Sequence, residues 1–308
     1  MEDPLDISHE IRSALNRNEP VVALESSVIA HGLPVGVNVR TAIEMEENVR
    51  QGGAVPATVG LIGGKLRVGL SREEIEALGK GGAAKIAARD IPYTVARKLD
   101  GGTTVSATVR IAAAAGINVV ATGGIGGVHR GFAESHDVSA DLWELARTPV
   151  VVVCSGVKSV ADTPATMEWL ETHGVPVCGY QTDLFPAFYS RSSGIAVPKI
   201  ESAVDLAGVL KLAVGAFGMR CAVIIGVPIP KENEIDASAA IDQAVHEAGE
   251  RGIKGQALTP FLLNRVGELT GGKSLEANTA LLANNARVAG EIAVTLTEDA
   301  QRRMGFVL

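Results

Sequence analysis

The sequence predicts an α/β fold with helices on both faces of a mostly parallel sheet. Short aliphatic runs recur along the chain, helical patterns alternate with them, and 46% of the 308 residues are hydrophobic while only 4% are aromatic. Continuous aliphatic runs are typical of strands buried on both faces of a parallel sheet, and strand–helix alternation is typical of α/β proteins. No linker-like or low-complexity tract divides the chain, so we expect residues 1–308 to form a single domain.

The expected strands are the aliphatic runs, and the expected helices lie between and after them. The strands cover residues 21–30, 57–62, 117–124, 149–156, 175–180 and 221–228. The first helix ends near Gly52, and its apolar face consists of Val39, Ala42, Ile43 and Val49. A capping-box pattern, Ser71 with Glu74, begins the next helix. Further helices are expected over 104–116, 202–217 and 237–251, from Thr259 and Pro260, and from Ser274 towards Leu296.

Charge and composition exclude several classes of function. The 28 Lys and Arg residues against 35 Asp and Glu give a net charge of −7 without a basic cluster, so we do not expect a nucleic-acid binder. The acidic N-terminus has no hydrophobic segment, and no run approaches the roughly 20 apolar residues of a membrane helix. Cys154, Cys178 and Cys221 lie in or beside aliphatic runs without zinc-site spacing, so we expect buried thiols in a cytoplasmic protein.

Two charged residues lie where the carboxyl ends of strands would form a ligand site. In open α/β sheets, ligands bind beyond these ends. Glu25 interrupts the run VVALESSVIA, and burial would favour its protonated form, which suits a general acid; alternatively, it is a solvated residue at a strand end. Lys158 follows VVVVCSGV and is either an ordinary loop charge or an amine that attacks a carbonyl carbon.

Glycine-rich segments could bring backbone N–H groups close to an anion. Residues 101–105, GGTTV, form an expected turn before a helix, and residues 121–131, ATGGIGGVHRG, lack the position and spacing of a dinucleotide fingerprint. The alternative for both segments is a turn that binds no ligand. Lys85, in GGAAKIAARD, is expected in a helix or loop, either as a solvated cation or as a contact to a phosphate.

Histidine and aspartate side chains gather in the segment HRGFAESHDVSAD. Its carboxylates and imidazoles suit Mn²⁺ or Mg²⁺, although their spacing matches no strong metal motif. The alternative is a polar surface loop in which Asp137 or Ser139 caps the next helix. The residues concerned are His129, His136, Asp137 and Asp141.

Ten segments, taken in order, resemble one family. They are ALESSVIAHGLP, GAVPATVGLIGG, ARDIP, GGTTVSAT, ATGGIGGVHRG, DVSADL, CSGVKS, GVPVCGYQTD, PFLLNRVGELTGG and LLANNA. From about residue 12 to the C-terminal helix, the chain resembles the pseudouridine-5'-phosphate glycosidase family. The resemblance implies an α/β/α sandwich, a homotrimer and a separate pseudouridine kinase as pathway partner, because 308 residues leave no room for a fused kinase.

The resemblance implies reversible cleavage, with water, of pseudouridine 5'-phosphate to uracil and ribose 5-phosphate. The bond broken joins C1' of ribose to C5 of uracil. No glycosidic heteroatom is therefore available for protonation, and the two-carboxylate scheme of ordinary glycosidases does not apply. In the family mechanism the ribose ring opens, a lysine amine forms an imine-type adduct at C1', and the C–C bond is then cleaved.

The resemblance also assigns roles to residues. Lys158 in CSGVKS corresponds to the nucleophile, Glu25 in ALES to the proton donor, and Asp137 to the ligand of one Mn²⁺ per subunit. The substrate-binding positions are Lys85, Val105, Ser139, Ala140 and Asp141, with Thr104, His129 and Asn278 as further contacts. Two departures from the family pattern, Ser27 in place of a common threonine and the order Ser106-Ala107, are not expected to touch a catalytic group.

Two other functions remain open. One is a related C-glycoside-forming or pigment-pathway enzyme that joins another aglycone to ribose 5-phosphate. The other is a non-catalytic sugar-phosphate sensor, which would not need both Glu25 and Lys158. Formation of pseudouridine 5'-phosphate from uracil, ribose 5-phosphate and Mn²⁺ would separate the first choice from both.

Overall fold

The computed structural model describes residues 3–253, 255 and 258–305. Six parallel strands form the centre of an 11-stranded sheet, in the order β3-β2-β7-β9-β13-β11. Each of the six overlaps an expected strand, so the prediction of a mostly parallel sheet is confirmed. They are β2 (Val21–Leu24), β3 (Val55–Ile62), β7 (Val119–Ala121), β9 (Val151–Cys154), β11 (Val177–Tyr180) and β13 (Val223–Gly226).

Shorter strands extend this centre. In the sheet they are β1 (Leu5–Ile7), β4 (Lys65–Val68), β5 (Ala84–Ile86), β6 (Gly101–Thr103) and β12 (Lys199–Ile200), and β4 and β6 run antiparallel to β3. β8 (Val128–His129) and β10 (Ala161–Asp162) form a separate two-stranded sheet. Two predictions are wrong here. Residues 101–103 are not a turn, because they pair with β3 as strand β6. Lys85 is not in a helix or loop, because it lies in β5, which pairs with β6.

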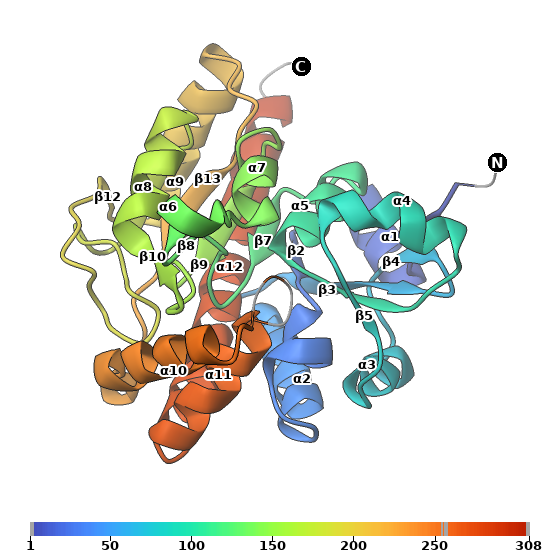
Figure 1. The fold of residues 1–308 in the computed structure, drawn as a ribbon. Coiled ribbons are helices and arrows are strands. Elements are labelled where there is room, and N and C mark those ends of the chain that lie inside the picture. The colour runs from blue at the N-terminus through green and yellow to red at the C-terminus, as the bar shows by residue number, and fades with distance from the viewer. Residues whose placement is uncertain (1–2, 254, 256–257, 306–308) are drawn as a thin grey trace.

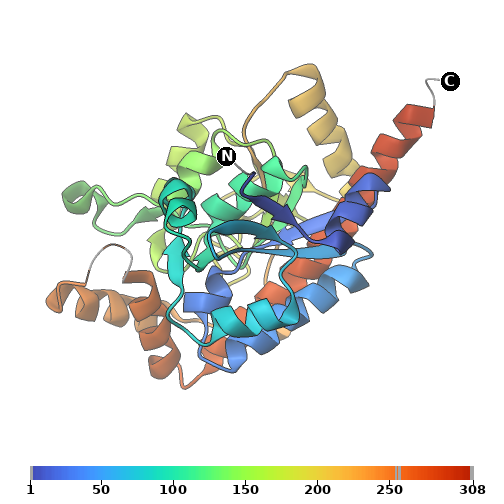
Figure 2. The ribbon, with the colours of Figure 1, turned by 90° about the vertical axis from the view of Figure 1, so that its right-hand side faces the viewer.

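Helices cover both faces of the sheet (Figure 1; Figure 2). Alternate residues of β9 face two different cores: Val151 and Val153 pack into one, and Val152 and Cys154 into the other. The first core includes side chains of α2 (Val37–Gln51), α9 (Ala203–Leu210), α10 (Ser238–Glu250), α11 (Leu258–Leu269) and α12 (Lys273–Gly305). The second includes α1 (His9–Asn16), α5 (Val105–Ala114), α7 (Ala140–Leu145) and α8 (Thr163–Thr172).

Smaller elements complete the described chain. The expected capping box is confirmed at α3 (Arg72–Gly79), where Ser71 and Glu74 exchange hydrogen bonds. The chain also forms α4 (Ile91–Ala96) and α6 (Phe132–Ser135). The three cysteines are buried and free, as expected. Among the described residues, no helix combines the length and apolar character needed to cross a bilayer.

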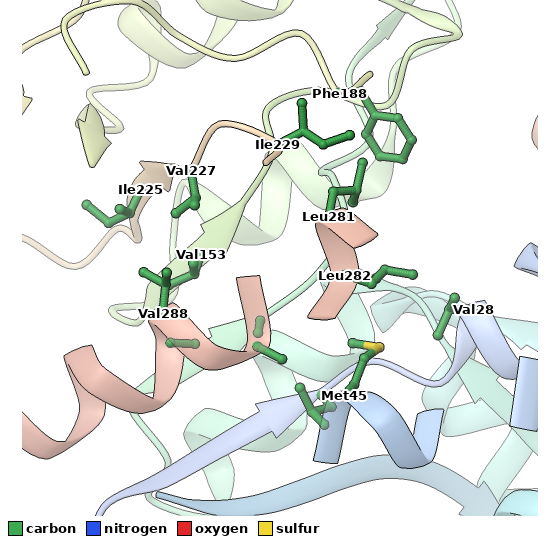
Figure 3. Close-up of a cluster of buried hydrophobic side chains, with 14 of the residues drawn as sticks. Val28, Met45, Val153, Phe188, Ile225, Val227, Ile229, Leu281, Leu282 and Val288 are labelled. Carbon is green, nitrogen blue, oxygen red and sulfur yellow. The ribbon is translucent and has the colours of Figure 1, made fainter. Parts of the chain in front are cut away.

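The helix α12 supports one face of the sheet. It extends to Gly305, beyond the expected end near Leu296. Figure 3 shows Leu281 of α12 beside Phe188, while Leu282 lies nearer to Met45, a residue of α2. The helix therefore joins α2 to the loops at the carboxyl edge of the sheet.

The expected strand over residues 21–30 is only half correct. β2 ends at Leu24, and Val28–Gly32 form a π-helical turn, η1. Val28 and Ile29 still pack into the same core as Leu24, so the apolar pattern indicated burial correctly but not the change of backbone conformation. The chain leaves the sheet at Glu25, which places this carboxylate at the strand's carboxyl end.

Candidate active site

Three neighbouring strands end beside one another, and polar residues follow each. Glu25 follows β2, Thr122 follows β7, and Ser155 follows β9. Because β7 lies between β2 and β9 and all three are parallel, these residues meet at one edge of the sheet. The edge is where ligands bind in open α/β folds.

The Glu25 carboxyl is buried and held by two hydroxyls. Its relative exposure is 4%; Thr122 Oγ1 donates to Oε1 and Ser27 Oγ donates to Oε2. The expectation that Ser27 touches no catalytic candidate is therefore wrong. Serine keeps the hydroxyl donor of the common threonine, so the hydrogen bond survives this departure from the family pattern.

The loop that carries Lys158 is fixed by a glycine and by backbone hydrogen bonds. Gly156 has φ +95°, and a Cβ there would collide with the carbonyl oxygen of Pro186. The Lys158 N–H donates to the Ile125 carbonyl at 2.8 Å. The lysine therefore starts from a defined backbone position, and its half-buried side chain lines two adjoining pockets.

We name the first of these the inner pocket. Glu25, Lys85 and Lys158 line it together with Asn278 of α12. Its other walls are largely apolar, so a flat ring with polar edges fits its chemistry. The apolar lining includes Val28, Phe188, Leu263 and Leu282.

The second, the outer pocket, has a volume of about 160 Å³. It shares Lys85 and Lys158 with the inner pocket, so one ligand could extend through both. The predicted site residues that line it are Lys85, Thr104, His129, Asp137, Ser139, Ala140, Asp141 and Lys158. The structure therefore gathers most of the predicted site at one place.

Asp141 joins the walls of the outer pocket. Its buried carboxylate accepts hydrogen bonds from the backbone N–H of Ser106 at 2.8 Å and of Gly126 at 2.9 Å. A Cβ on Gly126 would collide with Ser139 Oγ, so glycine is required at this approach. Ser139 caps α7, as the alternative interpretation of this segment proposed. The Ser106 position is thus in contact with a predicted substrate-binding residue.

Burial changes the proton affinity of several basic groups here. Burial lowers the pKa of Lys85, and repulsion from Lys158 lowers it further, while Asp141 and Glu25 act in the opposite direction. Burial likewise lowers the pKa of His129, against the attraction of Asp137. His31, which lines the inner pocket, also has its pKa lowered by burial. Both imidazoles retain one buried nitrogen without a hydrogen-bond partner, Nδ1 of His129 and Nε2 of His31.

Two predicted residues stand apart from these linings. Val105 is fully buried at the first position of α5, so its side chain packs in the core and only its backbone is near the site. His136 is exposed and lies edge-on to Phe132. No group of three or more His, Cys, Asp or Glu residues within the described chain could hold a metal. Asp137, half-buried in the outer pocket, remains the candidate ligand.

Sequence reasoning missed several residues of the site. Thr122, His31 and Phe188 were not singled out, although Thr122 and His31 belong to segments that carried the family resemblance. Thr122 lies near the carboxyl end of the expected strand 117–124, so the carboxyl-edge argument that selected Lys158 could have found it. Phe188 lies in a loop without a local signal.

The family of this chain follows from its similarity to known proteins. The family model described as Indigoidine synthase A like protein matches residues 10–295. A protein named pseudouridine-5'-phosphate glycosidase in Clostridium botulinum is 51% identical over 304 residues, which cover 97% of this chain and 99% of that protein. One of the same name in Escherichia coli is 51% identical over 295 residues, 94% of each chain. The chain belongs to the pseudouridine-5'-phosphate glycosidase family.

Solved structures confirm the fold. The prealnumycin C-glycosynthase AlnA, crystallised in complex with ribulose 5-phosphate, is 39% identical with a TM-score of 0.89, over 98% of this chain and 100% of that chain. An indigoidine synthase A-like protein from Thermotoga maritima is 37% identical with a TM-score of 0.86, over 96% and 98% of the two chains. The expected α/β/α architecture is therefore shared with proteins of recognisable sequence similarity.

Proposed function

We propose that this chain reversibly cleaves the C–C glycosidic bond of pseudouridine 5'-phosphate, with water, to uracil and ribose 5-phosphate. The observation that carries the proposal is the inner pocket, where Glu25, Lys85 and Lys158 converge from three separate segments. Beside apolar walls, the Glu25 carboxyl suits an acid, the Lys158 amine suits a nucleophile, and the charge of Lys85 suits contact with an anion. The names of relatives at 51% identity support this substrate.

In the proposed mechanism, Lys158 supplies the electron sink that a C-glycoside lacks. As the ribose ring opens at its C1'–O4' bond, the Lys158 nitrogen bonds to C1' and one of its protons passes to O4'. Its lone pair then forms a C=N bond while the C1'–C5 electron pair returns to the uracil ring, which takes up a proton from Glu25. Water hydrolyses the imine, releasing ribose 5-phosphate and restoring the amine.

The two pockets suggest how the substrate is oriented. We place the phosphate in the outer pocket, where Lys85 is joined by Thr104 at the N-terminus of α5. We place the uracil ring in the inner pocket against Phe188, within reach of Asn278. C1' then lies between them, beside Lys158, which lines both pockets.

We further propose that Asp137 holds one Mn²⁺. A single carboxylate is consistent with a hard ion that is completed by water and substrate oxygens rather than by a protein cage. His129, with its unpartnered buried Nδ1, lines the same pocket. When bound, the ion would neutralise negative charge on the phosphorylated sugar.

The family resemblance also supports a proposal about assembly and context. We propose a homotrimer in the cytoplasm that receives its substrate from a separate pseudouridine kinase. The exposed apolar side chains along residues 204–217 support an assembly, because such a patch is normally covered by a partner.

A second function in the same family is C-glycoside synthesis with another aglycone. The similarity to AlnA, at 39% identity, favours considering it. The higher identity to the glycosidases favours uracil. Incubation with uracil, ribose 5-phosphate and Mn²⁺ tests the choice: we expect pseudouridine 5'-phosphate, and its absence from an enzyme that binds ribose 5-phosphate would favour the synthase.

Trapping with borohydride tests the covalent step. We expect ribose 5-phosphate and borohydride to label the wild type once, on the peptide containing Lys158. Lys158→Ala should lose the label. Lys85→Arg is the matched control, because it keeps the charge in the pocket but removes the other primary amine, so it should still be labelled. A label on Lys85, or an equally labelled Lys158→Ala, would overturn the mechanism.

A further inference from the structure

Asn285 of α12 is a fully buried polar residue on a helix face that packs into the apolar core. A buried amide is costly unless its polar atoms are hydrogen-bonded, so its partners indicate its role. Its Nδ2 donates to the Thr122 carbonyl at 2.8 Å and to the Gly123 carbonyl at 3.4 Å. Its Oδ1 accepts from Ser155 Oγ at 3.1 Å. One amide thus joins the loops that follow β7 and β9.

The first loop leads directly to Glu25. Thr122, whose carbonyl accepts from Asn285, donates its own hydroxyl to Glu25 Oε1. The backbone position of Thr122 therefore sets the position of that hydroxyl. A shift of this loop would move the donor that holds the proposed acid.

The second loop leads to Lys158. The Ser155 N–H donates to the Gly123 carbonyl at 2.9 Å, and the Ser155 carbonyl accepts from the Phe188 N–H at 2.8 Å. Gly156, with its positive φ, and then Lys158 follow within three residues. Asn285 therefore contacts both loops at the point where they are hydrogen-bonded to each other.

We infer that Asn285 is a positioning residue that sets the Glu25 carboxyl relative to the Lys158 amine. The inference rests on the roles proposed above for these two residues. Asn285 lines neither pocket and so acts through its partners. Lys85 and Asp141, on segments that it does not touch, would still bind the phosphorylated sugar. Loss of Asn285 should therefore lower kcat and leave KM nearly unchanged.

Steady-state kinetics of Asn285→Ala with pseudouridine 5'-phosphate test this separation. We expect kcat to fall about 10- to 100-fold, because small misplacements of reacting groups have effects of this size, with KM changed less than about threefold. Asn284→Ala is the matched control on the same helix. Asn284 is half-buried, donates to the Pro228 carbonyl at 3.4 Å and accepts from Arg287 at 3.2 Å, so its hydrogen bonds do not involve the loops after β7 and β9. Its kcat should stay within about twofold of wild type.

Borohydride trapping separates positioning from partial unfolding. In Asn285→Ala we expect the full complement of sites to be labelled at saturation, but at a lower rate per site. A reduced number of sites, each labelled at the wild-type rate, would overturn the inference. If Asn285→Ala does not fold, Ser155→Ala replaces it, since it removes only the hydrogen bond at 3.1 Å; we expect a smaller loss of kcat at constant KM, and an unchanged kcat would overturn the inference.

A crystal structure of the Asn285→Ala or Ser155→Ala protein tests the geometry without any activity. We expect the Thr122 and Ser155 loops to separate and the Thr122–Glu25 hydrogen bond to lengthen or break. Loops and hydrogen bond unchanged from wild type would overturn the positioning role. Failure of the proposed function, by contrast, would appear as a wild type that neither turns over pseudouridine 5'-phosphate nor traps ribose 5-phosphate.

Discussion

Lys85 and Lys158 line the same two pockets, and their proximity affects the charge of Lys85. Burial lowers the pKa of Lys85, repulsion from Lys158 lowers it further, and Asp141 and Glu25 offset part of both effects. Lys85 is therefore closer to losing its charge at alkaline pH than an exposed lysine is. If Lys85 holds the phosphate, binding must weaken as this proton is lost.

The lowered pKa of Lys85 predicts that affinity for ribose 5-phosphate falls at alkaline pH. In a Lys158→Ala background, where no covalent bond can form, the Kd for ribose 5-phosphate should rise as pH increases through the lowered pKa of Lys85. Burial, the larger cause of the shift, persists in that background. Lys85→Arg should flatten the rise, because a guanidinium keeps its proton. Calorimetric titrations between neutral and alkaline pH check this; an identical rise with arginine would contradict the assignment.

At the scale of elements, the outer pocket depends on the pairing of α5 with α7. Glu144 of α7 has a side chain with 0% exposure; Arg110 of α5 contacts it at 2.8 Å, and Arg147 at 2.9 Å. Thr148 Oγ1 donates to it at 2.6 Å. Burial alone would raise the pKa of Glu144, but the hydrogen bonds from Arg110, Thr148 and Arg147 prevail and lower it. This ion pair connects two helices whose N-termini face the site.

Glu144→Gln should therefore destabilise the fold, in a pH-dependent way. At pH 7 we expect a loss of about 1–3 kcal/mol in the free energy of unfolding, because charged hydrogen bonds are lost from buried acceptors. A carboxyl with a lowered folded pKa contributes stability above its unfolded pKa, near 4.5, and loses it as pH falls through the folded value. The difference between variant and wild type should therefore shrink in acid.

Urea unfolding at neutral and acidic pH, at one protein concentration, measures this difference. Glu76→Gln is the control, because Glu76 pairs with Arg72 on the surface and its side chain is 48% exposed. We expect it to change stability by less than about 0.5 kcal/mol. Equal stability of Glu144→Gln and wild type at pH 7 would show that the pair does not hold α5 to α7.

The sequence patterns predicted the long central strands but not the short strands beside them. The six central strands were predictable because each lies in a short, largely aliphatic run of the sequence. Strands such as β5 and β6, with three residues each, contain lysine or glycine and exist only through pairing with their neighbours. The same reason hid Asn285: its hydrogen bond to Thr122 spans 163 residues of sequence. Glu25 and Lys158, in contrast, interrupt or follow apolar runs and so were found.

At the scale of the whole molecule, exposed apolar side chains concentrate in one segment, residues 204–217, which we call the apolar patch. Nine large hydrophobic side chains are exposed among the described residues, and four of them fall within residues 204–217. They are Val204, Leu212, Val214 and Phe217, with exposures of 70%, 56%, 48% and 78%. Apolar side chains gathered on a protein surface often mark an interface. A net charge of −7 opposes association of copies, so burial of such a patch must outweigh the repulsion.

The proposed trimer, taken as cyclic, constrains how this patch can be used. Its interfaces are heterologous, so each patch meets a different surface of the next copy and the ring closes after three contacts. A single substitution therefore alters every interface at once. We expect light scattering to give a particle of three times 31.9 kDa for the wild type, and a smaller particle for Phe217→Asp, which places charge in the patch. Tyr93→Asp is the control, because Tyr93 is 63% exposed but isolated from the patch in sequence. A wild-type monomer would contradict the trimer, whereas a trimeric Phe217→Asp would place the interface elsewhere.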